Sequence, residues 1–299
     1  MSRTRRAIGL TALAAVILAG ACGSNNDKQA ASTTTAAANV PERIVSLSAT
    51  GTEMLFAIGA GKQVVAVDDQ SNYPPTAPKT SLSGFKPNVE AIANYKPDLV
   101  VLTDSATEIK GGLEALGAKV FVQPAAKTLD DAYAQLRQLG TVTGHVDQAD
   151  TVATKMKSDL TKLKASLPTN ARGLTYYHEL DNTYFSATSS TFIGSVYSLL
   201  GLKNIADTAD KQGTGYPQLS AEYVLQANPD LVFLADTKCC QQSAATVAQR
   251  PGWSNMKAVK NGGVVELDDD IASRWGPRIV DYVRVVAAKI RKLPAKAAA

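Results

Sequence analysis

The chain alternates between short, continuous apolar runs and segments with the apolar spacing of amphipathic helices. In the first half, apolar runs predict four buried strands, at residues 43–47, 63–67, 99–102 and 119–122. Helical segments, including 52–58 and 128–139, lie between or after these runs. Continuous apolar runs are typical of strands covered on both faces, and their alternation with helices predicts a parallel sheet with right-handed crossovers.

One phrase of this pattern occurs twice. Residues 89–102 read VEAIANYKPDLVVL and residues 221–234 read AEYVLQANPDLVFL, and matching positions stand 132 residues apart. Each copy predicts a short helix that begins after a capping residue, Asn88 or Ser220, ends at a proline and leads at once into a buried strand. Two copies indicate two similar α/β lobes.

A long amphipathic helix is predicted between the two copies. Apolar side chains recur at helical spacing from about residue 147 to 167, and Pro168 ends the pattern. At 1.5 Å per residue this helix would span roughly 30 Å. The second half then adds strands at 174–179, 231–234 and 263–268 and helices at 192–200 and 277–292.

The predicted fold is therefore α/β, with two Rossmann-like lobes that each contain a parallel sheet and are joined by one long backbone helix. A ligand would bind at the carboxyl ends of the strands, between the lobes. The predicted boundaries are a signal peptide at 1–21, a tether at 22–40, a first lobe at 41–146, the connecting helix at 147–168 and a second lobe at 169–299.

The N-terminus has the layout of an export signal. Three arginines precede an apolar run at residues 7–19, which is too short for a stable transmembrane helix. The sequence LAGAC, ending at Cys22, resembles the lipobox of bacterial lipoproteins, in which the cysteine is lipidated; Leu18 lies one place further upstream than is usual. Cleavage after Ala21 by ordinary signal peptidase is the alternative. Residues 23–39 have the composition of a flexible tether.

Composition excludes some functions. The chain has 299 residues, of which 45% are hydrophobic and 19% charged, which is sufficient for two moderate cores. Removal of the signal peptide takes away three arginines and lowers the formal charge of +4 by three. A nearly neutral body argues against nucleic acid as a partner.

Four segments carry a family resemblance: PERIVSLSATGTEMLFAIGAG, VEAIANYKPDLVVL, LSAEYVLQANPDLVFL and GPRIV. Together they resemble the substrate-binding proteins of ABC importers for iron-siderophores, cobalamin and haem, from residue 41 to 293. The resemblance implies a monomeric, non-enzymatic binding protein without a cofactor. Its partners would be a small-molecule metal chelate and an ABC permease with its ATPase. A lipid anchor would hold it at the outer face of the cytoplasmic membrane.

Glu90 and Glu222 occupy matching positions in the two copies of the phrase. The resemblance implies that each pairs with permease arginines and so orients the binding protein. A structural alternative is that each acid stabilises the positive end of its helix macrodipole.

A candidate ligand site combines aromatic and cationic side chains from loops and strand ends. Its members are Tyr73, Phe85, Tyr177, His178, Tyr184, Arg274, Trp275 and Arg278. Such a set suits a large, flat ligand with anionic oxygens. Loop packing is the alternative for Tyr73 and Phe85, and a structural ion pair is the alternative for Arg278.

A ferric siderophore is the preferred ligand. Haem binders of the resembled family commonly carry a tyrosine where this chain has Phe85, and cobalamin binders have aromatic side chains near Gln70, Gly84 and Thr103, none of which is aromatic. A corrinoid would therefore depend on Tyr73, Phe85 and Trp275. A surface adhesion or interaction module is the alternative from a different class.

Direct metal binding and catalysis are not predicted. His145 and His178 are the only histidines, too few for a typical transition-metal site, and no G-x-S-x-G motif is present.

Cys239 and Cys240 are adjacent and follow a predicted strand. In an exported protein whose third cysteine, Cys22, is lipidated, these two are expected to form a vicinal disulfide. Two exposed loop cysteines without a role are the alternative.

Overall fold

The computed structural model describes residues 40–293. The expected signal peptide, the lipidated Cys22 and residues 23–39 of the tether lie outside the described residues, as do residues 294–299. Within the described part of the chain, no helix is both long enough and apolar enough to span a membrane.

The first lobe is built on a five-stranded parallel sheet with the order β3-β2-β1-β4-β5. Its strands are β1 (Ile44–Leu47), β2 (Val64–Asp68), β3 (Lys79–Leu82), β4 (Leu99–Thr103) and β5 (Lys119–Gln123). The central strand β1 and its neighbour β4 are the apolar runs that the sequence indicates, and they are buried almost throughout. Strand β3 was not predicted, because its sequence KTSL is polar and lies at the sheet edge.

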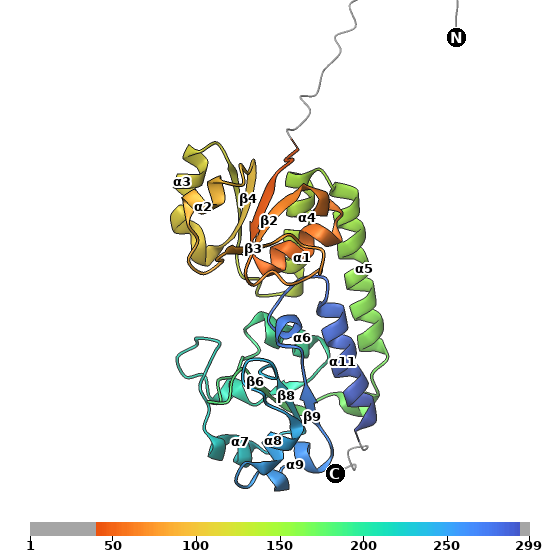
Figure 1. The fold of residues 1–299 in the computed structure, drawn as a ribbon. Helices are drawn as coiled ribbons and strands as arrows, with labels where there is room; N and C mark the ends of the chain where they lie inside the picture. The colour runs from red at the N-terminus through yellow and green to blue at the C-terminus, as the bar shows by residue number, and fades with distance from the viewer. Residues whose placement is uncertain (1–39, 294–299) are drawn as a thin grey trace, which may run out of the picture. The chain divides into compact units, whose positions relative to one another are not determined.

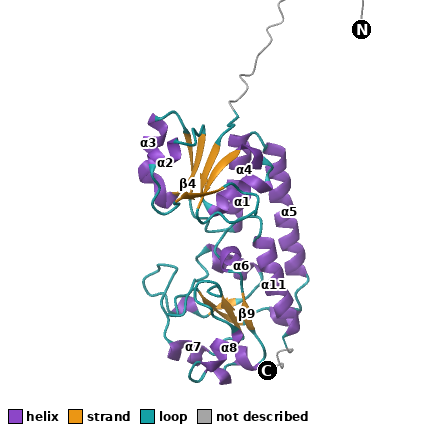
Figure 2. Ribbon diagram, viewed as in Figure 1, coloured by secondary structure: helices purple, strands orange, loops and turns teal. Residues whose placement is uncertain are grey.

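Helices cover both faces of this sheet (Figures 1 and 2). On one face α2 (Val89–Ala93) and α3 (Lys110–Ala115) pack through Ile92 and Leu113. On the other face lie α1 (Ala49–Ala57) and α4 (Leu129–Thr143). The coverage of both faces explains why the strands lack polar alternation.

The connecting helix is α5 (Val146–Ala165), close to the predicted 147–167. It packs against α4 of the first lobe and against α11 (Ile279–Lys292), the last helix of the second. Gly140 permits the close approach of α4 and α5, because a Cβ atom there would lie 2.4 Å from the Cβ of Ala149.

The second lobe has a four-stranded parallel sheet with the order β7-β6-β8-β9. The strands are β6 (Thr175–Glu179), β7 (Lys203–Asn204), β8 (Leu231–Leu234) and β9 (Val264–Glu266). The remaining helices are α6 (Phe192–Leu199), α7 (Ala221–Ala227), α8 (Ala244–Gln249), α9 (Lys257–Lys260) and α10 (Asp269–Ala272). The predicted fold class, two α/β lobes with parallel sheets, is confirmed.

The repeated phrase has the same structural role in both lobes. Asn88 and Ser220 cap α2 and α7 through their side chains, as predicted. The aspartate of the Pro-Asp pair then fixes the start of the neighbouring strand. Asp98 accepts hydrogen bonds from the main-chain N–H groups of Glu42, at 2.7 Å, and Arg43, at 3.0 Å, next to β1. Asp230 accepts one at 2.9 Å from the N–H of Thr175, the first residue of β6.

Candidate functional site

The carboxyl-end edges of the two sheets meet at a cluster of charged side chains that we call the interlobe cluster: Glu53, Asn72, Asp270, Arg274 and Arg278. Glu53 lies in α1, which follows β1, and Asn72 lies in the loop after β2. The other three residues follow the carboxyl end of β9. The cluster thus joins the two lobes at the edge where parallel sheets usually bind ligands.

Arg274 is the centre of the interlobe cluster. Its guanidinium donates to Glu53 Oε1 at 2.9 Å, to Asn72 Oδ1 at 2.8 Å and to the carbonyl oxygen of Gln70 at 2.9 Å. It also donates to Asp270 Oδ1 at 2.9 Å. Arg274 is only 8% exposed. The prediction that it contacts a ligand is not supported, because its donors are used to hold the lobes together.

Arg278 forms the structural ion pair that the sequence left open as an alternative. Its Nε donates to Glu53 Oε2 at 3.0 Å, and its Nη2 donates to Glu53 Oε1. The guanidinium also lies 4.2 Å from the ring centroid of Tyr73, within cation–π distance. Arg274 and Arg278 therefore both pair with the same buried carboxylate, that of Glu53.

Trp275 lies between these arginines in sequence and also bridges the lobes. Its indole Nε1 donates to Oε1 of Gln135, in α4, at 2.7 Å, and its ring packs edge-on against Phe192, in α6. The side chain is half-buried, so it keeps a partial surface near the predicted site.

Tyr177 and His178 are both fully buried, so the prediction that they contact a ligand is not supported. The strand β6 extends through Glu179 and is covered on both faces, which places these two side chains in the core rather than at the strand end. Tyr177 packs edge-on against Trp253, and His178 Nδ1 lies 2.9 Å from the hydroxyl of Tyr197. Burial lowers the pKa of His178 to about 3, so its imidazole is neutral.

A buried acidic pair at the carboxyl ends of β6 and β8 was missed from the sequence. Glu179 and Asp236 are both fully buried. Arg250 pairs with Glu179 through two hydrogen bonds of 2.6 and 2.5 Å. Both Asp236 carboxylate oxygens lack a hydrogen-bond partner among the described residues. Burial, reinforced by the nearby Glu179, raises the pKa of Asp236 to about 7. The available signal was an acid at the end of one predicted strand, Glu179, and another two residues after the next, Asp236.

Tyr184 belongs to this second-lobe layer rather than to an open surface. Its ring stacks on Trp253 with centroids 5.9 Å apart, and the Arg250 guanidinium lies 5.5 Å from the Tyr184 ring and 4.6 Å from the Trp253 ring. Tyr184 is half-buried, so only part of it is available to a ligand.

Four aromatic side chains are exposed on loops that leave the carboxyl ends of the strands. Tyr73 is 42% exposed and Phe85 76%, as the predicted site requires. Phe185, at 37%, and Tyr216, at 49%, were missed, although aromatic residues in loops rich in threonine, glycine and proline are a recognisable signal. These exposed rings at the carboxyl ends of strands are candidate ligand contacts, because parallel sheets usually bind ligands at that edge.

Gly84 determines the position of Phe85. A Cβ atom at residue 84 would lie 2.2 Å from Oδ2 of Asp68, at the end of β2. Any other residue would therefore require either the Asp68 side chain or the loop that carries Phe85 to shift.

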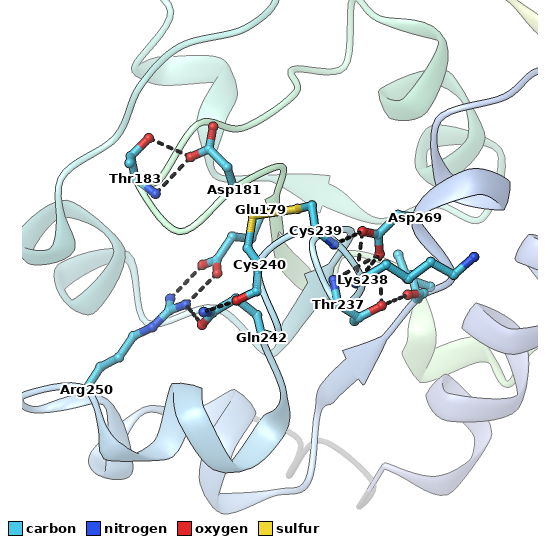
Figure 3. The surroundings of a disulfide bond; sticks show 11 residues. Glu179, Asp181, Thr183, Thr237, Lys238, Cys239, Cys240, Gln242, Arg250 and Asp269 are labelled. Atoms are coloured by element: carbon cyan, nitrogen blue, oxygen red, sulfur yellow. Dashed lines mark hydrogen bonds and ion pairs between the residues drawn. A yellow bond between two sulfur atoms is a disulfide. The ribbon is translucent and has the colours of Figure 1, made fainter. Parts of the chain in front are cut away.

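Cys239 and Cys240 form a disulfide in the loop between β8 and α8 (Figure 3). Their Cα atoms are 3.8 Å apart. Cys239 is exposed and Cys240 half-buried. The carboxylate of Asp269 accepts hydrogen bonds from the N–H groups of Thr237, Lys238 and Cys239 and so fixes this loop.

Glu90 and Glu222 are both exposed in the first turns of α2 and α7. Neither carboxylate forms an ion pair within residues 40–293. Both are therefore accessible to a partner, although the same position also suits a dipole role.

His145 precedes α5 as its N-cap residue, and its Nδ1 lies 2.9 Å from the carbonyl oxygen of Thr143. The described part of the chain contains no group of three or more His, Cys, Asp or Glu side chains that could hold a metal ion.

Comparison with known proteins identifies the class. The family described as periplasmic binding protein matches residues 44–271. An uncharacterized ABC transporter substrate-binding lipoprotein of Bacillus subtilis, YvrC, is 31% identical over 84% of this chain and 80% of its own length. A vitamin B12-binding protein of Pectobacterium carotovorum is 31% identical over 86% of this chain and 91% of its own.

A solved structure agrees with these relatives. The crystal structure of a possible iron-binding (periplasmic solute-binding) protein of Staphylococcus epidermidis has a TM-score of 0.72 and 26% identity, and the match covers 84% of this chain and 98% of that one. The chain belongs to the periplasmic binding protein family. It is a solute-binding protein and not an enzyme, which confirms the resemblance found in its sequence.

Proposed function

We propose that this protein is the substrate-binding component of an ABC importer, and that it binds cobalamin or another corrinoid between its two lobes. The importer role is supported by the family and by a relative named as an ABC transporter substrate-binding lipoprotein. The single observation that carries the ligand class is the set of four exposed aromatic rings on loops at the carboxyl ends of the strands. A corrin is a large, flat ring, which such side chains can cover.

The ligand that we prefer here differs from the one that the sequence favoured. The sequence favoured a ferric siderophore because aromatic side chains expected of haem and cobalamin binders are missing at Phe85, Gln70, Gly84 and Thr103. The contacts to that siderophore were expected from Arg274, Arg278 and Tyr177. Two of these are committed to Glu53 and the third is buried. Two exposed aromatic side chains that were not predicted from the sequence, Phe185 and Tyr216, join the candidate ligand site instead. A ferric siderophore remains the second candidate, because the similar structure from Staphylococcus epidermidis is titled as possibly iron-binding.

Isothermal titration with cyanocobalamin and with a panel of ferric siderophores tests the ligand. We expect the wild type to bind cyanocobalamin at micromolar concentration or tighter. Phe85→Ala and Tyr216→Ala should each weaken binding about tenfold, because a buried aromatic contact is worth on the order of 1 kcal/mol or more. Val285→Ala is a matched control, since Val285 is an exposed apolar residue on α11. Tight binding of a siderophore with no response to cyanocobalamin would reject the corrinoid assignment.

We also propose that Glu90 and Glu222 dock the protein onto its permease. Support comes from their exposure at matching positions of the two lobes. The double variant Glu90→Gln/Glu222→Gln should bind ligand normally but lose uptake and co-purification with the permease. Glu108→Gln, at another exposed acid, is the control. Normal uptake by the double variant would favour the helix-dipole role.

The expected export signal, the lipid on Cys22 and the anchoring at the outer face of the membrane complete the proposal. Mass spectrometry of the N-terminal peptide from membranes would show a lipidated Cys22, whereas an unmodified N-terminus at residue 22 would indicate ordinary cleavage after Ala21.

A further inference from the structure

The Cys239–Cys240 disulfide occupies an unusual place in the fold. It lies in residues 237–243, here called the disulfide loop, which leave the carboxyl end of β8. Strand β8 is an interior strand of the second sheet. Loops at the carboxyl ends of interior parallel strands border the usual ligand position. The disulfide is therefore placed among the loops that carry the exposed aromatic rings.

The disulfide loop is fixed from one side by Asp269. One carboxylate accepts hydrogen bonds from Thr237 N at 2.9 Å, Thr237 Oγ1 at 2.8 Å, Lys238 N at 3.0 Å and Cys239 N at 3.0 Å. The Lys238 side chain also pairs with Asp268 and Asp270.

The opposite side of the disulfide loop is fixed by the buried acidic layer. The N–H of Cys240 donates to the carbonyl oxygen of Asp236 at 3.2 Å, and Gln242 Nε2 donates to the carbonyl oxygen of Cys240 at 3.1 Å. Arg250 holds Gln242 through a hydrogen bond of 2.7 Å to Oε1. Figure 3 shows the disulfide between Asp269 on one side and the Glu179–Arg250 pair on the other.

These contacts direct the backbone N–H groups of the loop inward. The backbone N–H groups of residues 237–240 donate to Asp269 or to Asp236, while Cys239 itself remains exposed. The exposed part of the loop therefore contains Cys239 of the disulfide, between the exposed polar side chains of Lys238 and Gln241. Sulfur is apolar and polarizable, and it packs favourably against aromatic rings.

We propose that the Cys239–Cys240 disulfide is a ligand-contacting, specificity-determining element that packs against the flat conjugated ring of the ligand. The inference rests on the proposed function, in which that ring is a corrin, and it assigns to the disulfide a role that neither lobe architecture nor export requires. The sulfur pair acts as an apolar contact surface, in the same lobe as the exposed rings of Phe185 and Tyr216.

The test compares binding of cyanocobalamin by the oxidised mature protein, by the same protein under a phosphine reductant, and by Cys239→Ser/Cys240→Ser. We expect the reduced protein and the variant to bind about three- to tenfold more weakly, a range set by the strength of sulfur–aromatic contacts. Removal of the reductant and reoxidation should restore the affinity of the wild type. Gln241→Asn is the matched control, because Gln241 lies in the same loop with φ of 55°, a conformation that asparagine tolerates.

Other readouts separate this role from a structural one. Trp253 lies beneath Arg250, so an unchanged Trp253 fluorescence spectrum in the double-serine variant shows that the layer under the loop is intact.

Equal affinity of oxidised and reduced protein for cyanocobalamin would overturn the proposal while leaving the importer role in place. Binding of a ferric hydroxamate but not of cyanocobalamin would overturn it too, because a hydroxamate chelate has no flat conjugated ring. If the oxidised protein bound neither probe, the ligand class itself would be wrong and this inference would fall with it.

Discussion

At the scale of single residues, Asp236 is a buried acid of the second lobe with a raised pKa. Neither of its carboxylate oxygens has a hydrogen-bond partner among residues 40–293, and it lies near Glu179, Tyr177 and Arg250. One guanidinium cannot neutralise two carboxylates, so the folded protein retains a proton at Asp236 up to a pH of about 7.

This raised pKa predicts the direction of a pH effect on stability. The folded state binds the proton more tightly than the unfolded state does, so the stabilisation is complete below about pH 4 and is lost as the pH rises towards 7. Asp236→Asn should therefore raise the free energy of unfolding by about 1–3 kcal/mol at pH 8 and should flatten its dependence between pH 4 and 7. Urea unfolding at several pH values measures both effects.

Asp131 supplies a control of opposite sign. The side chain of Thr128 and two backbone N–H groups lower the pKa of Asp131, and its stabilisation is present at neutral pH and lost as the pH falls. Asp131→Asn should therefore reduce stability at pH 8. A destabilised Asp236→Asn variant at pH 8 would contradict the account of the acidic pair.

Glu53 is the second residue whose environment predicts a large effect. It is 3% exposed and receives hydrogen bonds from both Arg274 and Arg278. Glu53→Gln would leave two guanidinium groups without their shared carboxylate, and we expect a loss of about 3 kcal/mol in the free energy of unfolding. Glu108→Gln, at an exposed acid, should change stability by less than about 0.5 kcal/mol. Similar urea midpoints for the two variants would show that the interlobe cluster stabilises little.

At the scale of secondary-structure elements, the repeated Pro-Asp pair has a clear task. It ends a helix and then uses a carboxylate to fix the first residues of the adjacent parallel strand. Charge-assisted hydrogen bonds to a backbone N–H are stronger than neutral ones, so each aspartate sets where its strand begins.

Loss of either aspartate should therefore act locally. We expect Asp98→Ala to cost about 1–3 kcal/mol of stability and to raise amide hydrogen exchange at the start of β1, with β6 unaffected. Asp230→Ala should raise exchange at the start of β6, with β1 unaffected. Exchange that rose equally in both lobes would show that the contacts stabilise the whole chain rather than a strand start.

The elements divide into those the sequence predicts and those it does not. Strands β1, β4 and β8 are largely apolar because they are covered on both faces, and this is visible in the sequence. The polar edge strand β3 and the two-residue strand β7 carry no such pattern, because their existence depends on pairing with a neighbour. The helices α5 and α11 were predicted to within about two residues because their apolar spacing is long and regular.

The candidate site was harder to predict, for a related reason. The contact between Arg274 and Glu53 joins residues 221 positions apart, and nothing local in the sequence distinguishes an arginine that binds a ligand from one that pairs with a distant acid. Tyr177 and His178 were assigned to the ligand site because they stand near the end of a strand whose predicted bounds, 174–179, were correct; the covering of both faces of that strand, which buries them, depends on distant elements. Tyr73 and Phe85 follow strand ends and are exposed, as the site predicted from the sequence requires, and their contact with a ligand stays a prediction.

At the scale of the whole molecule, the lobes are joined by α5, by the interlobe cluster and by the hydrogen bond from Trp275 to Gln135. Such separate connections restrain rotation more than a flexible linker does, so we expect only a small closure on ligand binding. Small-angle scattering of the protein with and without cyanocobalamin should give nearly equal radii of gyration. A large compaction would show that α5 bends, and the Glu53→Gln variant would then reveal how much the cluster resists the movement.

The interlobe cluster also affects how the ligand is released to the permease. Opening of the lobes exposes Glu53 and separates it from both Arg274 and Arg278, so separation of the lobes costs free energy. Where release to the permease requires that separation, the available source of free energy in an importer is ATP hydrolysis transmitted through the permease. Release of the ligand to the permease would then require free energy from ATP hydrolysis, whereas binding of the ligand would be spontaneous. This difference would give transport its direction.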